Sequence, residues 1–364
     1  MFVPGARAAR LLVAIGLVLS VTAGVGQVQA PASFASRVAQ LSERGGFFDT
    51  DNLISNERSY LHVVPALRAS GVSGGAYIGV GPDQNFSYIA QVKPAIAFII
   101  DLRRDNLLLH LLFKALFSMS DTRAEYLSLL FGRPVPTPAG EWRTADLDKI
   151  VAYVEGTRLP DAAVTELRTR VDQKIKTFGV PISDADFATI DRFHRRFVAA
   201  GLPLKFQTTG RAPQSYYPTY RDLLLETDRQ GRRWNFLASE DDFEFVRGLE
   251  RRDLVIPVVG DLAGPTALAE IGRLMTSRGD RLSAFYASNV EFYLFADGKF
   301  PRFVENLERL PRGNRSLIIR SVFGGFGQST PGYYSSSLVQ PVDQLLQGYA
   351  SGNFHSYPEL AVAR

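Results

Sequence analysis

Cysteine is absent from the chain, and histidine, methionine and tryptophan are scarce. Without cysteine, none of the 364 residues can form a disulfide bond, a thiolate metal ligand or a cysteine nucleophile. The four histidines, His62, His110, His194 and His355, are not spaced as metal ligands, and His110 lies within an apolar run. We therefore predict no metal site, and we expect His110 to be a core residue with a satisfied ring.

Neither sign of charge is in large excess. The chain has 41 Lys and Arg against 37 Asp and Glu, a formal net charge of +4, and its 46% hydrophobic content is typical of a globular protein. The basic residues are scattered among acids and form no patch interleaved with aromatic residues. The composition therefore predicts no nucleic-acid partner.

Residues 1–30 have the pattern of a secretory signal peptide. Arg7 and Arg10 precede the apolar stretch 11–25, and Val28-Gln29-Ala30 supplies a small–x–small cleavage site. The apolar stretch is shorter than the roughly 20 residues of a comfortable membrane span, although an uncleaved anchor is the alternative. We predict export to the periplasm or the medium, with no stable membrane span after cleavage.

The remainder of the chain alternates short apolar runs with amphipathic segments. This alternation is typical of an α/β fold, and we predict a Rossmann-like, doubly wound, mainly parallel sheet. The strands are expected at 76–80, 95–100, 233–238, 254–259, 282–287 and 316–323. The helices between them are expected at 33–44, 55–70, 86–92, 107–117, 240–250, 265–278 and 303–310.

The strands and helices fall into one domain, residues 31–330, with a helical insertion. The insertion spans about residues 120–210 and contains amphipathic helices at 144–157, 161–177 and 184–199. Residues 331–364 are predicted to be a C-terminal tail with one helix at 338–347. The oligomeric state is not predicted.

The region 76–106 gives the strongest functional signal. The first strand ends in Gly79-Val80-Gly81, a helix and a second strand follow, and Asp101 lies 20 residues beyond Gly81. Strand, glycine turn, helix, strand and acid, in this order, form a nucleotide site in doubly wound folds. Gln84 occupies the position of the third glycine of the dinucleotide fingerprint, which breaks the NAD pattern, and turn glycines alone are the alternative. We predict a small-molecule, nucleotide-like ligand.

Polar residues follow each predicted strand, where ligands bind in an open parallel sheet. In chain order they are Gly79, Gly81, Asp83, Asn85, Asp101, Arg103, Ser239, Glu240, Asp241, Asp261, Asn289, Glu291 and Tyr293. The sequence therefore predicts a polar cleft at this edge of the sheet.

The segment 49–57 allows two interpretations. It folds over the glycine turn as a lid, or it is the capped start of a helix with Ser55 or Asn56 as N-cap and Glu57 in the first turn. In the first case Asn56 and Glu57 would contribute to substrate binding, together with Asn289 and Tyr293.

Four segments carry a resemblance to a known family: residues 75–90, 99–117, 255–265 and 285–294. They resemble a family of uncharacterised bacterial proteins that is similar to class I S-adenosylmethionine-dependent methyltransferases. The resemblance covers residues from about 35 to 323.

The resemblance implies roles for individual residues. Gly79 and Gly81 would let the methionine part of S-adenosylmethionine lie over the turn, Asp101 would hold the ribose hydroxyls, and Asp241 would face the adenine amine. Asp83, Asn85 and Arg103 complete the set assigned to the cofactor. Asp261 would lie near the substrate or the methyl group, and Asp261 or Glu291 would act as the general base.

Two hypotheses follow. The first is an S-adenosylmethionine-dependent methyltransferase-like protein of unknown substrate. The second is an exported, non-catalytic domain that binds a nucleoside-like or other polar ligand. The signal peptide and the incomplete glycine motif favour the second hypothesis, because S-adenosylmethionine is made and kept in the cytoplasm.

Overall fold

The structure is a computed structural model that describes residues 1–2, 32–210, 212, 214–324 and 330–362. The predicted signal peptide lies, from residue 3 onward, outside the described residues. Contacts divide the chain into Met1–Ala32 and Ser33–Arg364, and the fold described below is that of the second unit.

The second unit contains a six-stranded sheet with the strand order β3-β2-β1-β4-β5-β6. Neighbouring strands from β3 to β5 pair in parallel, and β6 pairs antiparallel with β5. The strands are β1 (Ala76–Val80), β2 (Ile96–Asp101), β3 (Val255–Val259), β4 (Leu282–Ser288), β5 (Arg312–Phe323) and β6 (Ser335–Pro341). The α/β class and the mainly parallel sheet are therefore confirmed.

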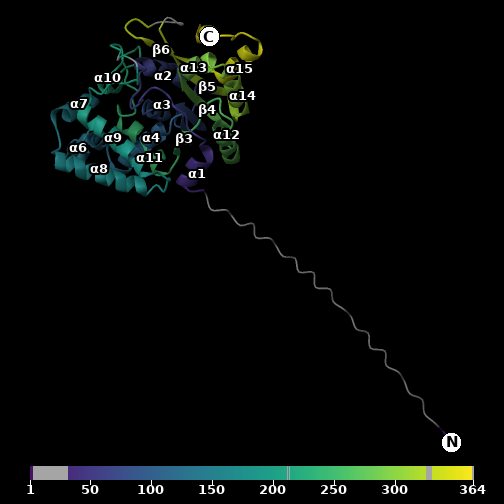
Figure 1. The fold of residues 1–364 in the computed structure, drawn as a ribbon, viewed down its shortest axis with the longest axis horizontal. Helices are drawn as coiled ribbons and strands as arrows, with labels where there is room; N and C mark the ends of the chain where they lie inside the picture. The colour runs from purple at the N-terminus through teal and green to yellow at the C-terminus, as the bar shows by residue number, and fades with distance from the viewer. Residues whose placement is uncertain (3–31, 211, 213, 325–329, 363–364) are drawn as a thin grey trace. The chain divides into compact units, whose positions relative to one another are not determined.

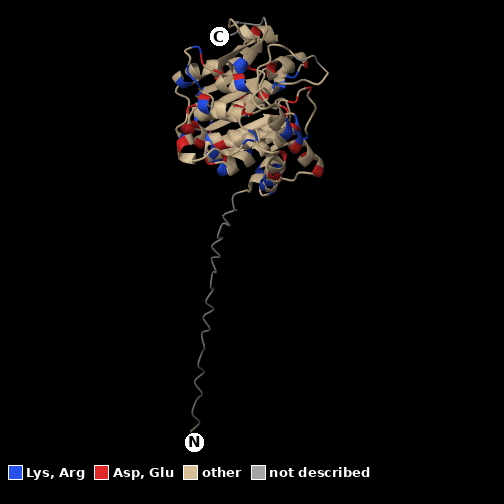
Figure 2. Cartoon of the chain, turned by 90° about the vertical axis from the view of Figure 1, so that its left-hand side faces the viewer, with Lys and Arg blue, Asp and Glu red and all other residues tan. Residues whose placement is uncertain are grey.

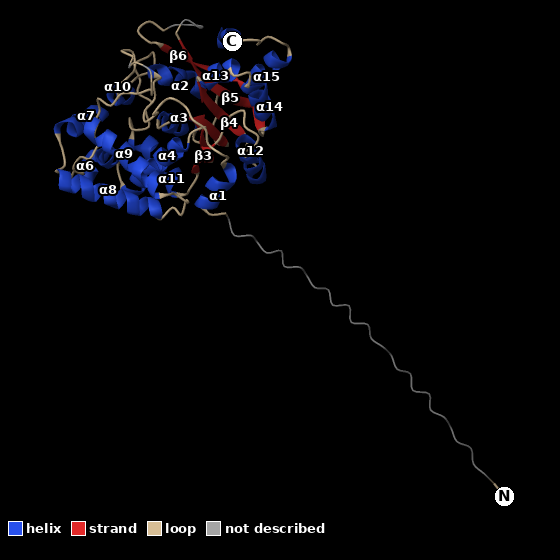
Figure 3. Cartoon of the chain, viewed as in Figure 1, coloured by secondary structure: helices blue, strands red, loops and turns tan. Residues whose placement is uncertain are grey.

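Helices surround the sheet (Figures 1 and 3). Those near the N-terminal end of the unit are α1 (Phe34–Leu41), the 3-10 helix η1 (Arg58–Val63), α2 (Val64–Ala69), α3 (Gln84–Val92) and α4 (Arg104–Met119). Those between β2 and β3 continue with α5 (Arg123–Leu130), α6 (Ala139–Arg143), α7 (Leu147–Gly156), α8 (Asp161–Lys176), α9 (Asp184–Ala200), α10 (Tyr220–Leu225) and α11 (Glu240–Arg251). The last are α12 (Ala267–Arg278), α13 (Val290–Ala296), α14 (Phe300–Arg309), α15 (Val342–Ala350) and α16 (Tyr357–Val362).

The central strands and α4 form the core because their side chains are apolar on every face. Every residue of β1 and β3 is buried, as expected for parallel strands covered on both faces. α4 is buried over most of its length and contacts β2, β3 and α11 on the sheet side and α8 and α9 of the insertion. α4 therefore joins the insertion to the sheet, and the three amphipathic helices expected in the insertion are confirmed as α7, α8 and α9.

The strand predicted at 233–238 was wrong. Asp228 accepts hydrogen bonds from the backbone N–H of Gln230 and Arg232 and from the indole of Trp234. Side chains also accept from the backbone just beyond, where the N–H of Phe236 donates to the Ser87 hydroxyl. The N–H groups of Leu237 and Ala238 donate to the side chain and the carbonyl of Asn235, so a local turn and Ser87 take the groups that a strand would pair with a neighbour.

The tail predicted at 331–364 was also wrong. Residues 335–341 form β6, and the helix expected at 338–347 begins only at Val342. The strand is rich in serine, so it lacked the apolar signal of the others. Its hydroxyls pack inward instead: Ser335 and Ser337 hydrogen-bond Ser59 of η1 at 3.1 and 3.2 Å.

Charges of both signs are interspersed on the face of the unit shown in Figure 2. None of the helices in the described part of the chain is both long and apolar enough to cross a bilayer.

Candidate functional site

A cavity of about 460 Å³ lies at the carboxyl ends of four neighbouring strands. Gly81 follows β1, Asp101 ends β2, Gly260 follows β3 and Asn289 follows β4, and all four line the cavity. Its volume falls within the range of small-molecule sites, about 300–1,000 Å³. The cleft predicted at this edge of the sheet is therefore present.

The segment 47–57 covers the cavity from the other side. Thr50 pairs as an isolated bridge with Thr208, and the N–H of Asp51 donates to the carbonyl of Gln207 at 3.1 Å. The Asp51 carboxylate also pairs with Arg196 of α9. These contacts bind the segment to the insertion. The 3-10 helix η1 begins directly after it, but Glu57 holds the N-cap position, so the N-cap interpretation of Ser55 and Asn56 was wrong; Ser55 instead accepts from the N–H of Glu57 at 3.0 Å. We call residues 47–57 the cover.

The two glycines of the turn do different things. Gly81 has a φ of +85° and lines the cavity. Gly79 does not line the cavity, and a Cβ there would lie 1.9 Å from Oδ1 of Asn85 and 2.7 Å from the hydroxyl of Tyr77. Gly79 therefore makes room for Asn85 and not for a ligand.

Asn85 and His110 hold the glycine turn from behind. The Asn85 amide donates to the carbonyls of Val80 and Pro82 at 2.9 and 2.8 Å and accepts from the Tyr77 hydroxyl at 2.8 Å. The Nε2 of His110 lies 2.9 Å from the carbonyl of Gly81. Burial lowers the pKa of His110 to about 4, so the ring is neutral and donates this bond. Both residues shape the site without lining it.

Asp83 also lies behind the turn, and Gln84 lies in front of it. Asp83 accepts from the Tyr220 hydroxyl at 2.8 Å, and burial raises its pKa to about 6. Gln84 lines the cavity and donates to the Tyr286 hydroxyl at 3.2 Å. Its buried Oε1 accepts no hydrogen bond from the residues that the structure describes.

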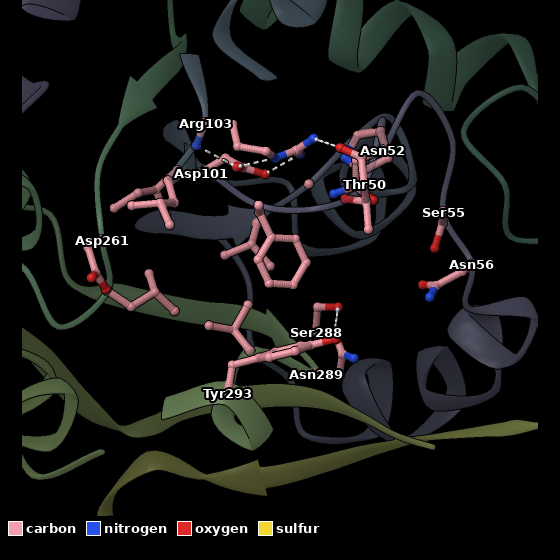
Figure 4. Close-up of a pocket in the computed structure, with 18 of the residues that line it drawn as sticks. Thr50, Asn52, Ser55, Asn56, Asp101, Arg103, Asp261, Ser288, Asn289 and Tyr293 are labelled. Atoms are coloured by element: carbon pink, nitrogen blue, oxygen red, sulfur yellow. Dashed lines mark hydrogen bonds and ion pairs between the residues drawn. The ribbon is translucent and has the colours of Figure 1, made fainter. Parts of the chain in front are cut away.

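Asp101 and Arg103 form an ion pair on one side of the cavity, opposite Ser288, Asn289 and Tyr293 (Figure 4). Asp101 accepts from the backbone N–H of Arg103 at 2.8 Å and from its guanidinium at 3.1 and 2.9 Å. The guanidinium donates further to the carbonyl of Thr50 at 2.8 Å. Arg103 thus links the acid at the end of β2 to the cover.

Asp261 lies at the end of β3. Its carboxylate accepts from the backbone N–H of Ala263 at 2.9 Å and pairs with Lys299 at 3.1 Å. Both Asp261 and Lys299 line the cavity. Asp261 is partly exposed, so a ligand in the cavity can contact its carboxylate at the carboxyl end of β3.

Glu57 is the buried acid of the cavity wall. Its carboxylate accepts from the hydroxyls of Tyr286, Ser288 and Ser321. No Lys, Arg or His among the described residues lies within ion-pair distance of it. Burial raises the pKa of Glu57 because no cation offsets the loss of water.

Asn56, Asn289 and Tyr293 line the same cavity as Glu57, so the four residues predicted on the substrate side are brought together. The Tyr293 ring packs edge to face on Phe48 of the cover, with ring centroids 4.9 Å apart. This contact closes the cavity between α13 and the cover.

Glu291 and Asp241 are not in the cavity. The Glu291 carboxylate is buried against the guanidinium of Arg320 at 2.6 and 3.2 Å, because α13 turns this residue inward. Asp241 is exposed in the first turn of α11, since the strand expected before it does not exist. The positions predicted for these two acids were wrong.

The sequence did not single out several residues that line the cavity: Thr50, Asn52, Phe206, Tyr217, Ser288 and Lys299. Thr50 and Asn52 lay within the segment 49–57 proposed as a lid, and Ser288 directly follows the strand predicted at 282–287, so these three positions had a signal in the sequence. Phe206 and Tyr217 reach the cavity through the fold of the insertion, which no local pattern reveals.

The sequence model of one family matches residues 53–133 and 205–350, and its description is Domain of unknown function (DUF7790). The chain belongs to this family. The matched segments contain all six strands, and the gap between them contains α6 to α9. The match therefore covers the sheet and most residues that line the cavity, whereas the helices α6 to α9 and four residues of the cover, Phe47, Phe48, Thr50 and Asn52, lie outside it. No curated protein matches the chain.

Proposed function

We propose that the cavity binds S-adenosylmethionine or a closely related nucleoside, and that the protein is a methyltransferase-like protein of unknown substrate. The observation that carries this proposal is the position of the cavity in the strand order. β1 lies between β2 and β4, the point where the order of a doubly wound, Rossmann-like sheet reverses, and such folds bind nucleotides there. Gly81 and Asp101 lie at that point.

The polar groups of the cavity suit such a ligand. S-adenosylmethionine presents ribose hydroxyls, an adenine amine and an ammonium group, all of which donate hydrogen bonds. The cavity offers carboxylate acceptors for these groups at Asp101 and Asp261.

The corrected strand count changes the roles implied by the resemblance. The acid after the third strand is Asp261, so it takes the role of facing the adenine amine that was first given to Asp241. Ser288 and Asn289 follow the fourth strand and become the residues nearest the methyl group. Asp101 keeps the role of holding the ribose, with Arg103 orienting it.

Bound S-adenosylmethionine would supply an electrophilic methyl group, and the chain would orient the acceptor and take its proton. Glu291 is excluded as the base by its pairing with Arg320. Glu57 replaces it, because it lines the cavity beside Ser288 without a cationic partner among the described residues, and burial raises its pKa.

A second candidate function is binding without turnover. Three of the four acids that line the cavity already accept hydrogen bonds from the protein: Asp101 from Arg103, Asp261 from Ala263, and Glu57 from three hydroxyls. Export, which we also propose from the pattern of residues 1–30, favours this second candidate. Fractionation of the host cells, followed by N-terminal sequencing of the recovered protein, tests export, and recovery from the cytoplasm with an intact Met1 would contradict it.

Calorimetric titration of the full chain with S-adenosylhomocysteine tests ligand binding. We expect Asp101→Asn and Asp261→Asn to weaken binding at least tenfold, about 1.4 kcal/mol. Asp241→Asn is the matched control, because this acid is exposed outside the cavity, and it should bind as the wild type does. A folded wild-type chain that binds neither S-adenosylhomocysteine nor S-adenosylmethionine would refute the proposal.

Methyl transfer to small acceptors, measured with labelled S-adenosylmethionine, separates the two candidates. Transfer that is lost in Glu57→Gln supports the enzyme, and binding without any transfer supports the second candidate.

A further inference from the structure

A second, smaller cavity of about 230 Å³ adjoins the first. Asn56, Tyr217, Asn289 and Tyr293 line both cavities, so a ligand in one meets a ligand in the other. The other six lining residues belong to the smaller cavity alone. Seven of its ten lining residues carry aromatic rings.

The rings form two groups, and within each group the rings pack on one another. Phe292 packs edge to face on Tyr293 and Tyr357, with ring centroids 5.2 and 5.4 Å apart. Tyr216 stacks on Tyr334 with centroids 3.6 Å apart, and on Tyr217 edge to face at 5.0 Å. Ring-on-ring packing of this kind fixes the faces that a flat ligand would contact.

Three of these rings are exposed, although burial would stabilise them. Tyr216 is 38% exposed, Phe292 is 41% exposed and Tyr334 is 45% exposed. Between residues 32 and 361, the described part of the chain has only two other exposed large hydrophobic side chains, Val135 and Phe47, and Phe47 lines the larger cavity. Exposed apolar side chains are thus concentrated around the two cavities, a distribution that marks a binding surface.

The residues that line the smaller cavity also favour a neutral ligand. No Asp, Glu, Lys or Arg is among the described residues that line the smaller cavity. A charged ligand would lose water there without gaining a partner. The amides of Asn56 and Asn289, where the cavities meet, offer one polar substituent both donors and acceptors.

We propose that the smaller cavity is a binding subsite for a neutral, single-ring aromatic compound that carries a hydroxyl. Its volume admits one ring, its walls stack on that ring, and the two amides bind the hydroxyl at the junction with the larger cavity. The assignment of this ring as the methyl acceptor rests on the function proposed above.

The test is a ¹⁹F NMR titration of the full chain with 4-fluorophenol, which is neutral at pH 7. We expect saturable binding that weakens at least fivefold in Phe292→Ala and in Tyr334→Ala. Val135→Ala is the matched control, because this exposed apolar side chain lines neither cavity, and it should leave binding unchanged. Thermal unfolding of each variant verifies that it is folded, and Tyr216→Ala replaces either variant that is not.

Several results would overturn the subsite. They are absence of 4-fluorophenol binding, equal binding in all variants, equally tight binding of 4-fluorobenzoate, or displacement of 4-fluorophenol by methyl glucoside. Binding of S-adenosylhomocysteine is measured in parallel and should persist in Phe292→Ala. If the wild type binds 4-fluorophenol but does not bind S-adenosylhomocysteine, the proposed function is refuted and the subsite is supported as a ring-binding site alone.

Discussion

Glu57 and Glu291 are both fully buried beside β5, and the fold satisfies their carboxylates in opposite ways. Glu291 pairs with Arg320, and Glu57 accepts from Ser321 and two further hydroxyls. Arg320 and Ser321 are consecutive residues of one strand, so their side chains point to opposite faces of the sheet. One face thus carries a closed ion pair and the other a titratable acid at a cavity.

The difference shows that the burial of a carboxylate does not by itself indicate whether its role is structural or functional. A buried carboxylate with a guanidinium partner is part of the framework, whereas one held only by hydroxyls has a raised pKa and retains the ability to exchange a proton. Partner type, and not depth, separates the structural acid from the functional one.

The largest expected effect comes from breaking the ion pair. Glu291→Gln leaves the buried guanidinium of Arg320 without a counter-charge, and we expect the free energy of unfolding to fall by about 3–5 kcal/mol. Urea denaturation of the full chain measures it. Glu57→Gln is the matched control and should change stability by less than about 1 kcal/mol, because the hydroxyls can reorient around an amide. Equal losses in the two variants would contradict the comparison.

The two turn glycines extend the same comparison to the backbone. Gly79→Ala places a Cβ on the Asn85 side chain, and we expect it to cost about 1–3 kcal/mol of stability by overpacking. Gly81→Ala strains a φ of +85° by about 1 kcal/mol and points into the cavity, so it should also weaken binding of S-adenosylhomocysteine. Denaturation and calorimetry on both variants check this. If Gly81→Ala destabilised the protein more than Gly79→Ala, both glycines would have a structural role and the comparison would fail.

The smallest effect is the pH dependence due to Glu57. Because its folded pKa is raised above the unfolded value of about 4.3, the folded state binds more protons between the two values, and stability falls as pH rises through that interval. Asp83 and Glu250 have raised pKa values of about 6 and about 7 and contribute with the same sign. The difference between wild type and Glu57→Gln, measured by denaturation from pH 4 to 8, isolates Glu57. A difference that does not change with pH would show that Glu57 does not titrate there.

The elements that the sequence predicted are those whose local pattern agrees with the fold. The buried runs of β1, β2, β3 and β4 and the amphipathic helices of the insertion had such patterns. β6 was missed because its serines pack through hydrogen bonds to Ser59 of η1 and Ser321 of β5, and not through apolar burial. The false strand at 233–238 was apolar for a different reason: Phe236 and Leu237 pack into the core from a turn.

The candidate site was predicted where residues directly follow a strand and missed where long-range packing decides. Gly81, Asp101, Asp261 and Asn289 directly end or follow strands, and all line the cavity. Glu291 lies only two residues beyond Asn289, but a helix had already begun and turned it inward. The hydroxyls around Glu57 come from β4 and β5, which are more than 200 residues away in the chain, so no local pattern could reveal them.

Hydrogen exchange of the full chain with saturating S-adenosylhomocysteine tests the central claim, a nucleoside site at the carboxyl edge of the sheet. The account predicts slower exchange in the cover and in the segments 81–84, 101–103 and 261–264, with α8 and α11 unchanged. Slower exchange confined to other segments, or no change in any segment, would contradict it.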